Sequence, residues 1–409
     1  MIGGFVLCTL LGYYLLDSIA KILNLRSSKT QVPSEFADVY DEVRYRRSQE
    51  YTIANTRFEL VQAACSLMAL LIFWFSGGFE FLDQWVRQFG LSNTVAGLLY
   101  VSILCIAREA ISLPFEVYHT YVIEQRFGFN RTEVKTFIHD RLKGWLVSGL
   151  LLCLFLSIVL TLFGKNAWIV AWACTATLSS LLMYLAPTLI LPLFFKFSPL
   201  PEGALRDELT ALCGRQRFPV RELLVIDGSR RSSKANAFFT GFGSNKRIAL
   251  YDTLIVNHTV PELLAVLAHE IGHFKRNHII QHFIFGQLNL LLLFFAASLC
   301  VDRPEIFAAF GVTTPSLYVG LALFLILVRP ATVLIGVAAN YFSRRHEFEA
   351  DRFAAEAMGD PNPLIRALKR LSKDSLSNLT PHPLLVALRF THPSVLARVL
   401  ALRKTEKPV

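Results

Sequence analysis

Residues 261–301 have the sequence PELLAVLAHEIGHFKRNHIIQHFIFGQLNLLLLFFAASLCV, which joins the two patterns that decide the fold. From Glu262 to about Asn277 the apolar residues recur with the period of an amphipathic helix, and Pro261 suits the first turn of such a helix. The following run, Ile279–Val301, is apolar for long enough to cross a bilayer. We therefore expect one helix that continues into a membrane span.

The composition of the whole chain is also that of a membrane protein. Hydrophobic residues make up 53% of the 409 residues and charged residues only 18%, whereas soluble domains carry about a quarter charged residues. Pro187, Pro192 and Pro330 lie in apolar runs and are expected to kink their helices. Seven runs are long enough to span a bilayer: Ile2–Leu23, Leu60–Leu82, Val95–Val117, Trp145–Phe163, Ala167–Phe194, Ile279–Val301 and Leu317–Phe342.

Lys and Arg are shared unequally between the two sets of loops. One side has little more than Arg87, Lys165 and Arg303, whereas the other side carries the basic loops, the segment 196–280 and the C-terminal tail. By the positive-inside rule the basic side is cytoplasmic. The net charge of +10 follows from this asymmetry, so it indicates contact with an anionic bilayer and not nucleic-acid binding.

A polar segment, Ser198–Ala268, precedes the amphipathic helix. It contains a predicted helix, Ala204–Cys213, and then strand-like pieces separated by turn sequences, of which Gly241–Asn245 is one. The predicted strands are Glu222–Ile226, Ala235–Thr240 and Arg247–Tyr251, and we expect them to form a small antiparallel sheet.

The amphipathic helix carries an HExxH pattern. His269 and His273 are four residues apart, so both imidazoles project from one face and can bind one Zn²⁺ at about 2.0–2.1 Å. Glu270 is placed to take a proton from a zinc-bound water, whose pKa falls to about 7, and the hydroxide would attack a peptide carbonyl. Gly272 is expected to leave open space beside the metal. The pattern indicates a zinc metalloprotease; the alternative is two histidines packed in a helix.

A catalytic zinc requires a third protein ligand, and Ser343–Asp351 can supply it. Glu347 and Asp351 are four apart, hence on one helical face. Glu347 can bind zinc, and Asp351 can accept the second ring N–H of a ligating histidine. Glu349 and His346 point elsewhere and are expected to face solvent, so the spacing favours Glu347.

Other polar groups in or near the spans have two possible roles. His278 and His282 lack an adjacent Glu and are interpreted as structural or interfacial histidines. Ionisable residues inside spans either line a hydrated chamber leading to the zinc or make interhelical ion pairs and hydrogen bonds; they are Asp17, Arg108, Glu109 and Arg329.

Taken together, these residues resemble the type I CAAX prenyl proteases, which are integral membrane zinc metalloendopeptidases. The resemblance covers nearly the whole chain. It rests on separate motifs in the same order: Leu113–Asn130 (LPFEVYHTYVIEQRFGFN), Phe197–Gly203 (FSPLPEG), Gly228–Gly241 (GSRRSSKANAFFTG), the HExxH helix, Ser343–Asp351 and Thr391–Arg398 (THPSVLAR).

The resemblance implies further residue roles. Glu347 matches the family's third zinc ligand and Asp351 its supporting acid, which completes a set of one Zn²⁺ per chain held by His269, His273 and Glu347. His392 matches a histidine thought to stabilise the oxyanion. Arg398 and Asn236 match residues near the substrate.

The implied fold is an all-α membrane barrel of about seven transmembrane helices enclosing a chamber, with a cytoplasmic α+β, gluzincin-like zinc protease domain. The chain then divides into a membrane region with five transmembrane helices (1–197), a zinc-protease segment with the small sheet (198–278), spans six and seven (279–342) and a helical segment that completes the zinc site (343–409).

The implied activity is cleavage near the C-terminus of proteins or peptides, including those that end in a prenylated CAAX motif. Two departures indicate a bacterial inner-membrane member with a broader set of peptide substrates, and the basic loops put its zinc site towards the cytoplasm. The segment from Tyr251 to Pro261 is short, and the tail Glu406–Val409 has no dilysine signal. The sequence leaves the oligomeric state open.

Two alternatives compete with this hypothesis. A heat-shock-type quality-control metalloprotease would share the zinc motif but usually has about four spans. A transporter or lipid-binding chamber with structural zinc would need a fourth protein ligand, and no Cys lies near the motif to supply it.

Overall fold

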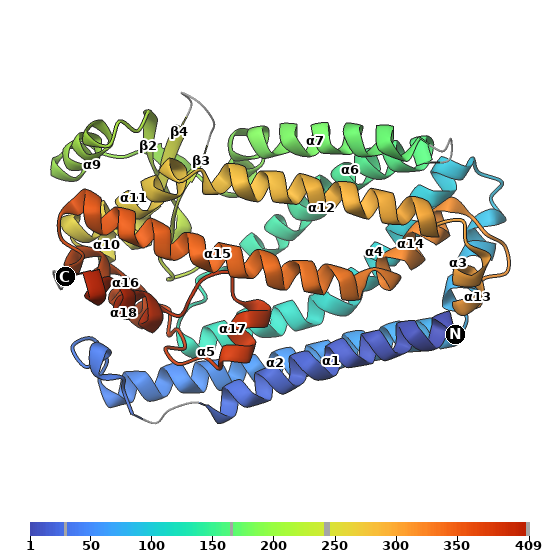
Figure 1. Ribbon diagram of the computed structural model, residues 1–409, viewed down its shortest axis with the longest axis horizontal. Helices are drawn as coiled ribbons and strands as arrows, with labels where there is room; N and C mark the ends of the chain where they lie inside the picture. Colours follow the sequence, from blue (N-terminus) through green and yellow to red (C-terminus); the bar gives the residue numbers. More distant parts are fainter. Residues whose placement is uncertain (28–30, 164–166, 241–245, 406–409) are drawn as a thin grey trace.

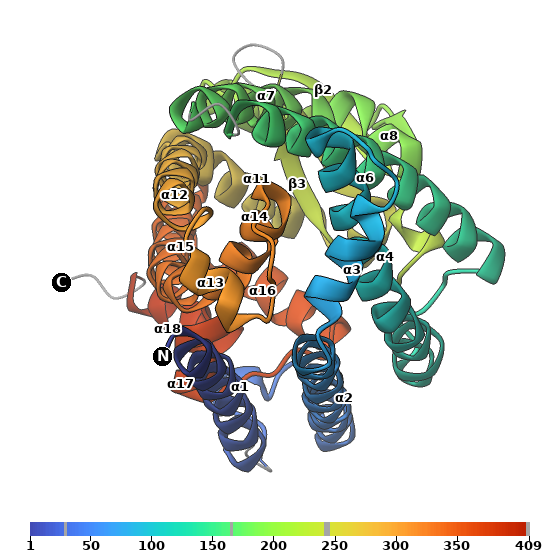
Figure 2. The same ribbon diagram turned by 90° about the vertical axis from the view of Figure 1, so that its right-hand side faces the viewer.

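The structure, a computed structural model, describes residues 1–27, 31–163, 167–240 and 246–405. Long helices run side by side along one axis, and a small sheet with shorter helices lies at one end (Figure 1). Viewed along that axis, the long helices are arranged in a ring (Figure 2). The predicted turn Gly241–Asn245, Lys165 and the tail Glu406–Val409 lie outside the described residues.

The membrane part agrees with the predicted number of spans. Among the described residues, six helical segments are long and apolar enough to cross a bilayer, and counting a pair of helices bent by 52° as one span brings the number to seven. The elements of this part are α1 (Ile2–Arg26), α2 (Glu42–Phe75), α3 (Gly78–Arg87), α4 (Asn93–Tyr118), the π-helix η2 (His119–Glu124), α5 (Gln125–Phe127), α6 (Val134–Phe163), α7 (Trp168–Leu189), α8 (Leu191–Phe194), α12 (His278–Cys300), α13 (Pro304–Ala309), α14 (Leu317–Leu327) and α15 (Arg329–Met358).

Two predicted spans differ from the observed helices. The span Leu60–Leu82 is too long, because α2 ends at Phe75 and Gly77 takes a left-handed conformation (φ +76°) before α3. The span Leu317–Phe342 is two helices, α14 and α15. Pro330 lies in the first turn of α15, where its missing N–H costs no helical hydrogen bond, and the chain bends there.

Charged side chains inside the spans make ion pairs and hydrogen bonds. Asp17 accepts a hydrogen bond from Arg389 (2.6 Å) and pairs with Lys21 (3.2 Å). Glu109 accepts a hydrogen bond from the indole N–H of Trp145 (2.9 Å). For Asp17 and Glu109, the interhelical interactions expected as one of two alternatives are therefore present.

Most of the remaining elements form the α+β part at one end of the molecule. They are η1 (Ser34–Phe36), β1 (Phe197–Pro199), α9 (Ala204–Arg215), β2 (Val220–Ile226), η3 (Gly228–Arg230), β3 (Ala237–Thr240), β4 (Lys246–Tyr251), α10 (Asp252–Asn257), α11 (Val260–Lys275), α16 (Asn362–Asp374) and α18 (Val395–Thr405). The short helix α17 (Pro383–Arg389) lies instead against α15 and α1 (Figure 1). Phe36, Tyr40 and Tyr45 pack into the same core as Ile248 and Leu263, so the loop between α1 and α2 is joined to this part.

The sheet is mixed, and the prediction of an antiparallel sheet was wrong. Its strand order is β1-β2-β4-β3, and the central pair, β2 and β4, is parallel. β3 enters between them in sequence but pairs with β4 on its far side, antiparallel. β3 is therefore an edge strand, and it lies next to α11.

The amphipathic helix does not continue into the sixth span, contrary to expectation. α11 ends at Lys275, and α12 begins at His278. Between them Asn277 takes a left-handed conformation with φ of +58°, which Asn tolerates better than most residues. The HExxH helix and the membrane helix are thus two separate elements joined by a short turn.

Candidate metal centre

The helix that carries the HExxH pattern is fixed at its start and along one face. The Thr259 side chain and Glu262 form a capping box, in which Glu262 accepts a hydrogen bond from the Thr259 backbone N–H at 2.9 Å. Leu263, Leu267 and Ile271 are buried in the core of the α+β part. The face that they define leaves His269 and His273 pointing towards α15.

Gly272 allows these two helices to approach closely. A Cβ atom at this position would lie 3.1 Å from the Cα and carbonyl oxygen of Ala350 and 3.2 Å from the Cβ of Phe353. The expectation that Gly272 leaves open space beside the metal was therefore wrong. The α15 backbone fills the space that a side chain at position 272 would take. This close approach brings Glu347 next to the two histidines.

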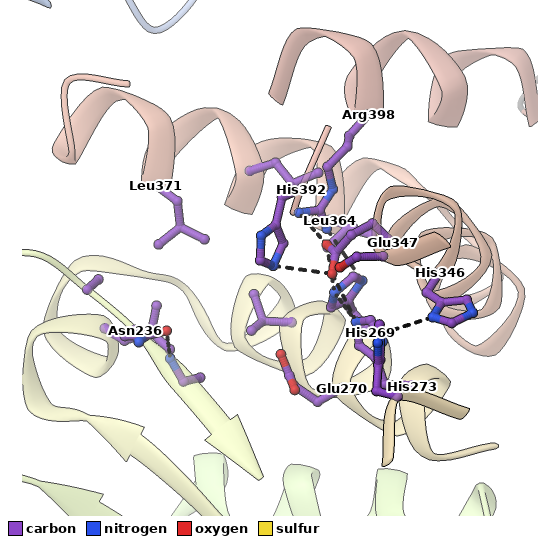
Figure 3. A pocket seen from close by; sticks show the side chains of 17 residues that line it. Asn236, His269, Glu270, His273, His346, Glu347, Leu364, Leu371, His392 and Arg398 are labelled. Atoms are coloured by element: carbon purple, nitrogen blue, oxygen red, sulfur yellow. Dashed lines mark hydrogen bonds and ion pairs between the residues drawn. The ribbon is translucent and has the colours of Figure 1, made fainter. Parts of the chain in front are cut away.

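Three side chains from α11 and α15 converge on one point (Figure 3). Nε2 of His269 lies 3.1 Å from Nε2 of His273, and the Glu347 oxygens lie 3.6 Å and 3.3 Å from these two nitrogens. Donors at about 2.0–2.1 Å from a tetrahedral zinc would be about 3.3 Å apart. Two imidazoles and one carboxylate at this spacing fit a zinc ion that keeps a fourth position open.

Behind this trio lies a buried ion pair. Oδ1 of Asp351 lies 2.9 Å from Nδ1 of His269, the nitrogen that faces away from the metal position. Arg398 donates to both oxygens of Asp351, at 2.8 Å and 2.6 Å, and its third nitrogen lies 3.1 Å from Oε2 of Glu347. Arg398 thus connects the carboxylate behind one candidate ligand with the carboxylate of another.

The electrostatic environment of this cluster shifts the pKa values of Arg398 and Glu270. Burial alone would lower the pKa of Arg398, but Asp351 and Glu347 outweigh it, so the pKa of Arg398 is raised and the guanidinium stays charged. Burial also raises the pKa of Glu270, while the neighbouring His269 and His273 oppose that rise. The shift at Glu270 is that expected of a desolvated carboxyl, and the shift at Arg398 is that of a cation held by two carboxylates.

A pocket of about 410 Å³ opens beside the trio. Glu270, His392 and Asn236 all line it (Figure 3). Its other wall is apolar, with Leu364, Leu368 and Leu371 of α16. The pocket therefore combines acid–base groups with a surface suited to an aliphatic side chain.

His392 and Asn236 reach the pocket from opposite sides. Nε2 of His392 lies 3.3 Å from Glu347, and Nδ1 lies 2.9 Å from the Thr391 hydroxyl. Burial lowers the pKa of His392, which favours the neutral imidazole. Asn236 directly precedes β3, where its Oδ1 accepts the Ala237 N–H at 2.9 Å.

A second histidine cluster lies behind His273. Nδ1 of His273 is 3.0 Å from Nδ1 of His278, whose Nε2 is 3.2 Å from Glu349. His346 stacks on His278, with ring centroids 4.0 Å apart, and contacts His282. The expectation that His346 faces solvent was wrong, because it is only 6% exposed, and Glu349 is only partly exposed.

The sequence did not single out Thr391, and it led to an interpretation of His278 as a structural or interfacial histidine. Thr391 directly precedes His392 in the motif Thr391–Arg398, so the sequence did indicate a hydroxyl beside the candidate oxyanion histidine. His278 contacts His273 because the left-handed conformation of Asn277 turns the chain between the two helices. That turn has no strong sequence signature.

Comparisons with known proteins agree with this geometry. A family model described as "CAAX prenyl protease N-terminal, five membrane helices" matches residues 21–196, and one described as "Peptidase family M48" matches residues 199–406. The chain is 33% identical to a CAAX prenyl protease 1 homolog of Oryza sativa subsp. japonica over 98% of this chain and 97% of that protein. It is 30% identical to the Homo sapiens homolog, covering 91% and 89%.

A solved structure is also similar over its whole length. It is the crystal structure of S. mikatae Ste24p, with a TM-score of 0.91 and 29% sequence identity, covering 98% of this chain and 99% of the other. The predicted fold, a barrel of membrane helices with an α+β domain at one end, is confirmed by this match.

Proposed function

Because this chain belongs to peptidase family M48 and to its CAAX prenyl protease group, it is a membrane metallopeptidase, and we propose that it is a zinc endopeptidase cutting near the C-terminus of its substrates. The observation that carries the proposal is the convergence of His269, His273 and Glu347 beside Glu270. Similarity over nearly the whole chain disfavours a heat-shock-type protease, and membership of a peptidase family excludes a transporter.

The proposed cofactor is one Zn²⁺ per chain, held by His269, His273 and Glu347. When bound, zinc supplies a Lewis acid that polarises the scissile carbonyl and makes water more acidic. Glu270 accepts the proton from the attacking water and later delivers it to the leaving amine. Its raised pKa suits both steps.

We assign His392 to the developing oxyanion. If the Thr391 hydroxyl donates to Nδ1 of His392, then Nε2 carries the proton and can donate into the pocket. The contact of Nε2 with the Glu347 carboxylate requires the same tautomer. Such a donor stabilises the charge that develops on the carbonyl oxygen.

Three groups act through the ligands. Asp351 fixes the orientation of His269, and Arg398 holds Asp351 and Glu347 in place while it lines the pocket. His278, backed by Glu349, fixes the ring of His273 in the same way. We class these as positioning residues.

The substrate segment is proposed to lie along the edge strand β3, with Asn236 beside it and an aliphatic side chain against α16. The substrates are protein or peptide C-termini, with or without a prenyl group. The short connection from Tyr251 to Pro261 supports a bacterial inner-membrane member, and the basic loops support a zinc site towards the cytoplasm. The domain limits at 197, 278 and 342 belong to the same proposal.

The test is Glu270→Gln in the full-length protein, assayed with a farnesylated CAAX peptide and with its unmodified counterpart. We expect a loss of cleavage with one zinc per chain retained, whereas His269→Ala should lose zinc. Retained cleavage in Glu270→Gln would contradict the assignment of the base. Equal cleavage of both peptides would contradict prenyl specificity but leave the endopeptidase intact.

A further inference from the structure

A second cavity lies away from the metal centre, between α2 and the continuous segment formed by the end of α4, η2 and α5. Its volume is about 700 Å³, within the range of about 300–1,000 Å³ typical of small-molecule sites. Figure 1 shows α5 beside α2 on the side of the molecule opposite α7. The motif Leu113–Asn130 supplies one wall of the cavity but contributes no residue to the metal pocket.

The wall has the character of a surface that contacts hydrocarbon. Phe58 stacks on Tyr118 with ring centroids 5.8 Å apart, and Ile123 and Phe127 are buried at its base. Tyr118 and Val122 keep 51% and 45% of their surface exposed. A π-helix over His119–Glu124 forms this wall, and π-helical turns are frequent at functional sites.

Two arginines stand at the cavity without an acidic or hydrogen-bonding partner among the described residues. Arg57 and Arg126 line it and are exposed, and among the described residues neither makes an ion pair or a hydrogen bond. The guanidinium of Arg126 lies 5.5 Å from the centre of the Phe127 ring, which fixes its direction without neutralising it. Glu50 also lines the cavity, so two positive charges and one negative charge leave a net charge of +1.

The arginines and the apolar wall are arranged like the headgroup and the acyl chains of a lipid: the charges lie at one end of the cavity and the apolar side chains at the other. Arg57 precedes the apolar part of α2, and Arg126 follows α4 and η2, so both lie where these helices leave the membrane. Phe58 and Tyr118 follow on the membrane side. A guanidinium pair binds phosphate well, because each fork donates two parallel hydrogen bonds.

We propose that this cavity binds an anionic phospholipid, with its phosphate between Arg57 and Arg126 and an acyl chain against Phe58, Val61 and Tyr118. A zwitterionic lipid would bring its own cation beside the two arginines, and a neutral isoprenoid would leave both guanidiniums unpaired. Charge complementarity therefore favours the anionic lipid. This site is separate from the proposed peptidase chemistry.

The test is native mass spectrometry of the full-length protein in detergent, with added phosphatidylglycerol or phosphatidylcholine of the same acyl chains. We expect preferential binding of phosphatidylglycerol. The variant Arg57→Gln/Arg126→Gln should weaken it by about fivefold for each arginine removed. Arg46→Gln, an exposed arginine of α2 outside the cavity, is the matched control and should bind as the wild type does.

A second variant tests the apolar part of the site. Ala54→Trp places a large ring in the cavity and should reduce lipid binding while thermal stability stays unchanged. Equal binding of the two lipids, or unaltered binding of phosphatidylglycerol by the double arginine variant, would overturn the proposal. Equal affinity for inorganic phosphate and for phosphatidylglycerol would also overturn it, because the acyl chain would then contribute nothing.

Discussion

Arg398 donates two hydrogen bonds to Asp351, from Nε at 2.8 Å and from Nη2 at 2.6 Å. Both residues are buried, with 8% of the surface of Arg398 and 2% of that of Asp351 exposed. The pair comes from two segments, α18 and α15, and lies directly behind His269. It closes the side of the metal centre that faces the protein core.

Removing the arginine should therefore affect stability and metal binding together. Arg398→Gln leaves Asp351 and Glu347 as buried carboxylates without their cation, which should destabilise the fold by about 3–5 kcal/mol. Zinc affinity should fall by about 10–100-fold as His269 loses its support. Thermal unfolding and zinc competition measure the two effects. Arg206→Gln, which removes only an exposed pair with Glu202, should change neither.

The histidine behind His273 offers a test of ligand positioning. His278→Ala should lower zinc affinity by about 10–100-fold, because the His273 ring loses the contact on its far nitrogen. His282→Ala is the control, because His282 contacts His346 and, among the described residues, makes no hydrogen bond or ion pair with a candidate ligand. A chelator titration gives the zinc affinity of each variant. Equal affinities for the two variants would show that the contact with His278 is incidental.

The close approach of α11 and α15 can be tested at Gly272. Gly272→Ala adds a Cβ 3.1 Å from the Ala350 backbone, which must then shift, and should cost about 1–3 kcal/mol. Gly286→Ala, in the middle of α12 with no atom within 4 Å of the added Cβ, should be neutral or stabilising by up to about 1 kcal/mol. Melting temperatures in one detergent compare the two variants. A stable Gly272→Ala would mean that the helices can separate at no cost.

Thr391 should matter to the rate and not to the metal. Thr391→Val removes the hydroxyl that sets the tautomer of His392 and should lower kcat, towards the loss of about 10²–10³ expected when an oxyanion donor such as His392 is removed. Thr391→Ser keeps the hydroxyl and should keep the rate. Steady-state kinetics and zinc content separate the two roles. A loss of zinc in Thr391→Val would point to a structural part for this residue.

The features of the fold predicted correctly from the sequence are those that depend on neighbours within a few residues. The spans follow from local hydropathy, and the placement of His269 with His273 on one helix, or of Glu347 with Asp351 on another, follows from a spacing of four. The break at Asn277 was missed because the polar run Lys275–His278 contains no Gly or Pro to mark the end of a helix. Local pattern alone does not register a single residue with positive φ.

Features that depend on distant residues could not be predicted in this way. The parallel pairing of β2 with β4 depends on β3 passing to the far side of β4. The burial of His346 depends on α12 lying across α15 so that His278 stacks on it. The close helix approach at Gly272 depends on Ala350, which lies 78 positions later in the chain. Each of these partners is set by tertiary packing.

The helix α15 runs without interruption from Arg329 to Met358, so one stiff rod begins among the membrane spans and ends with Glu347 and Asp351. The other half of the metal centre stands on α11, which the turn at Asn277 separates from its membrane helix. A tilt of the membrane helices would therefore move Glu347 and Asp351 together with α15, whereas His269 and His273 could change their angle to the membrane separately, at Asn277.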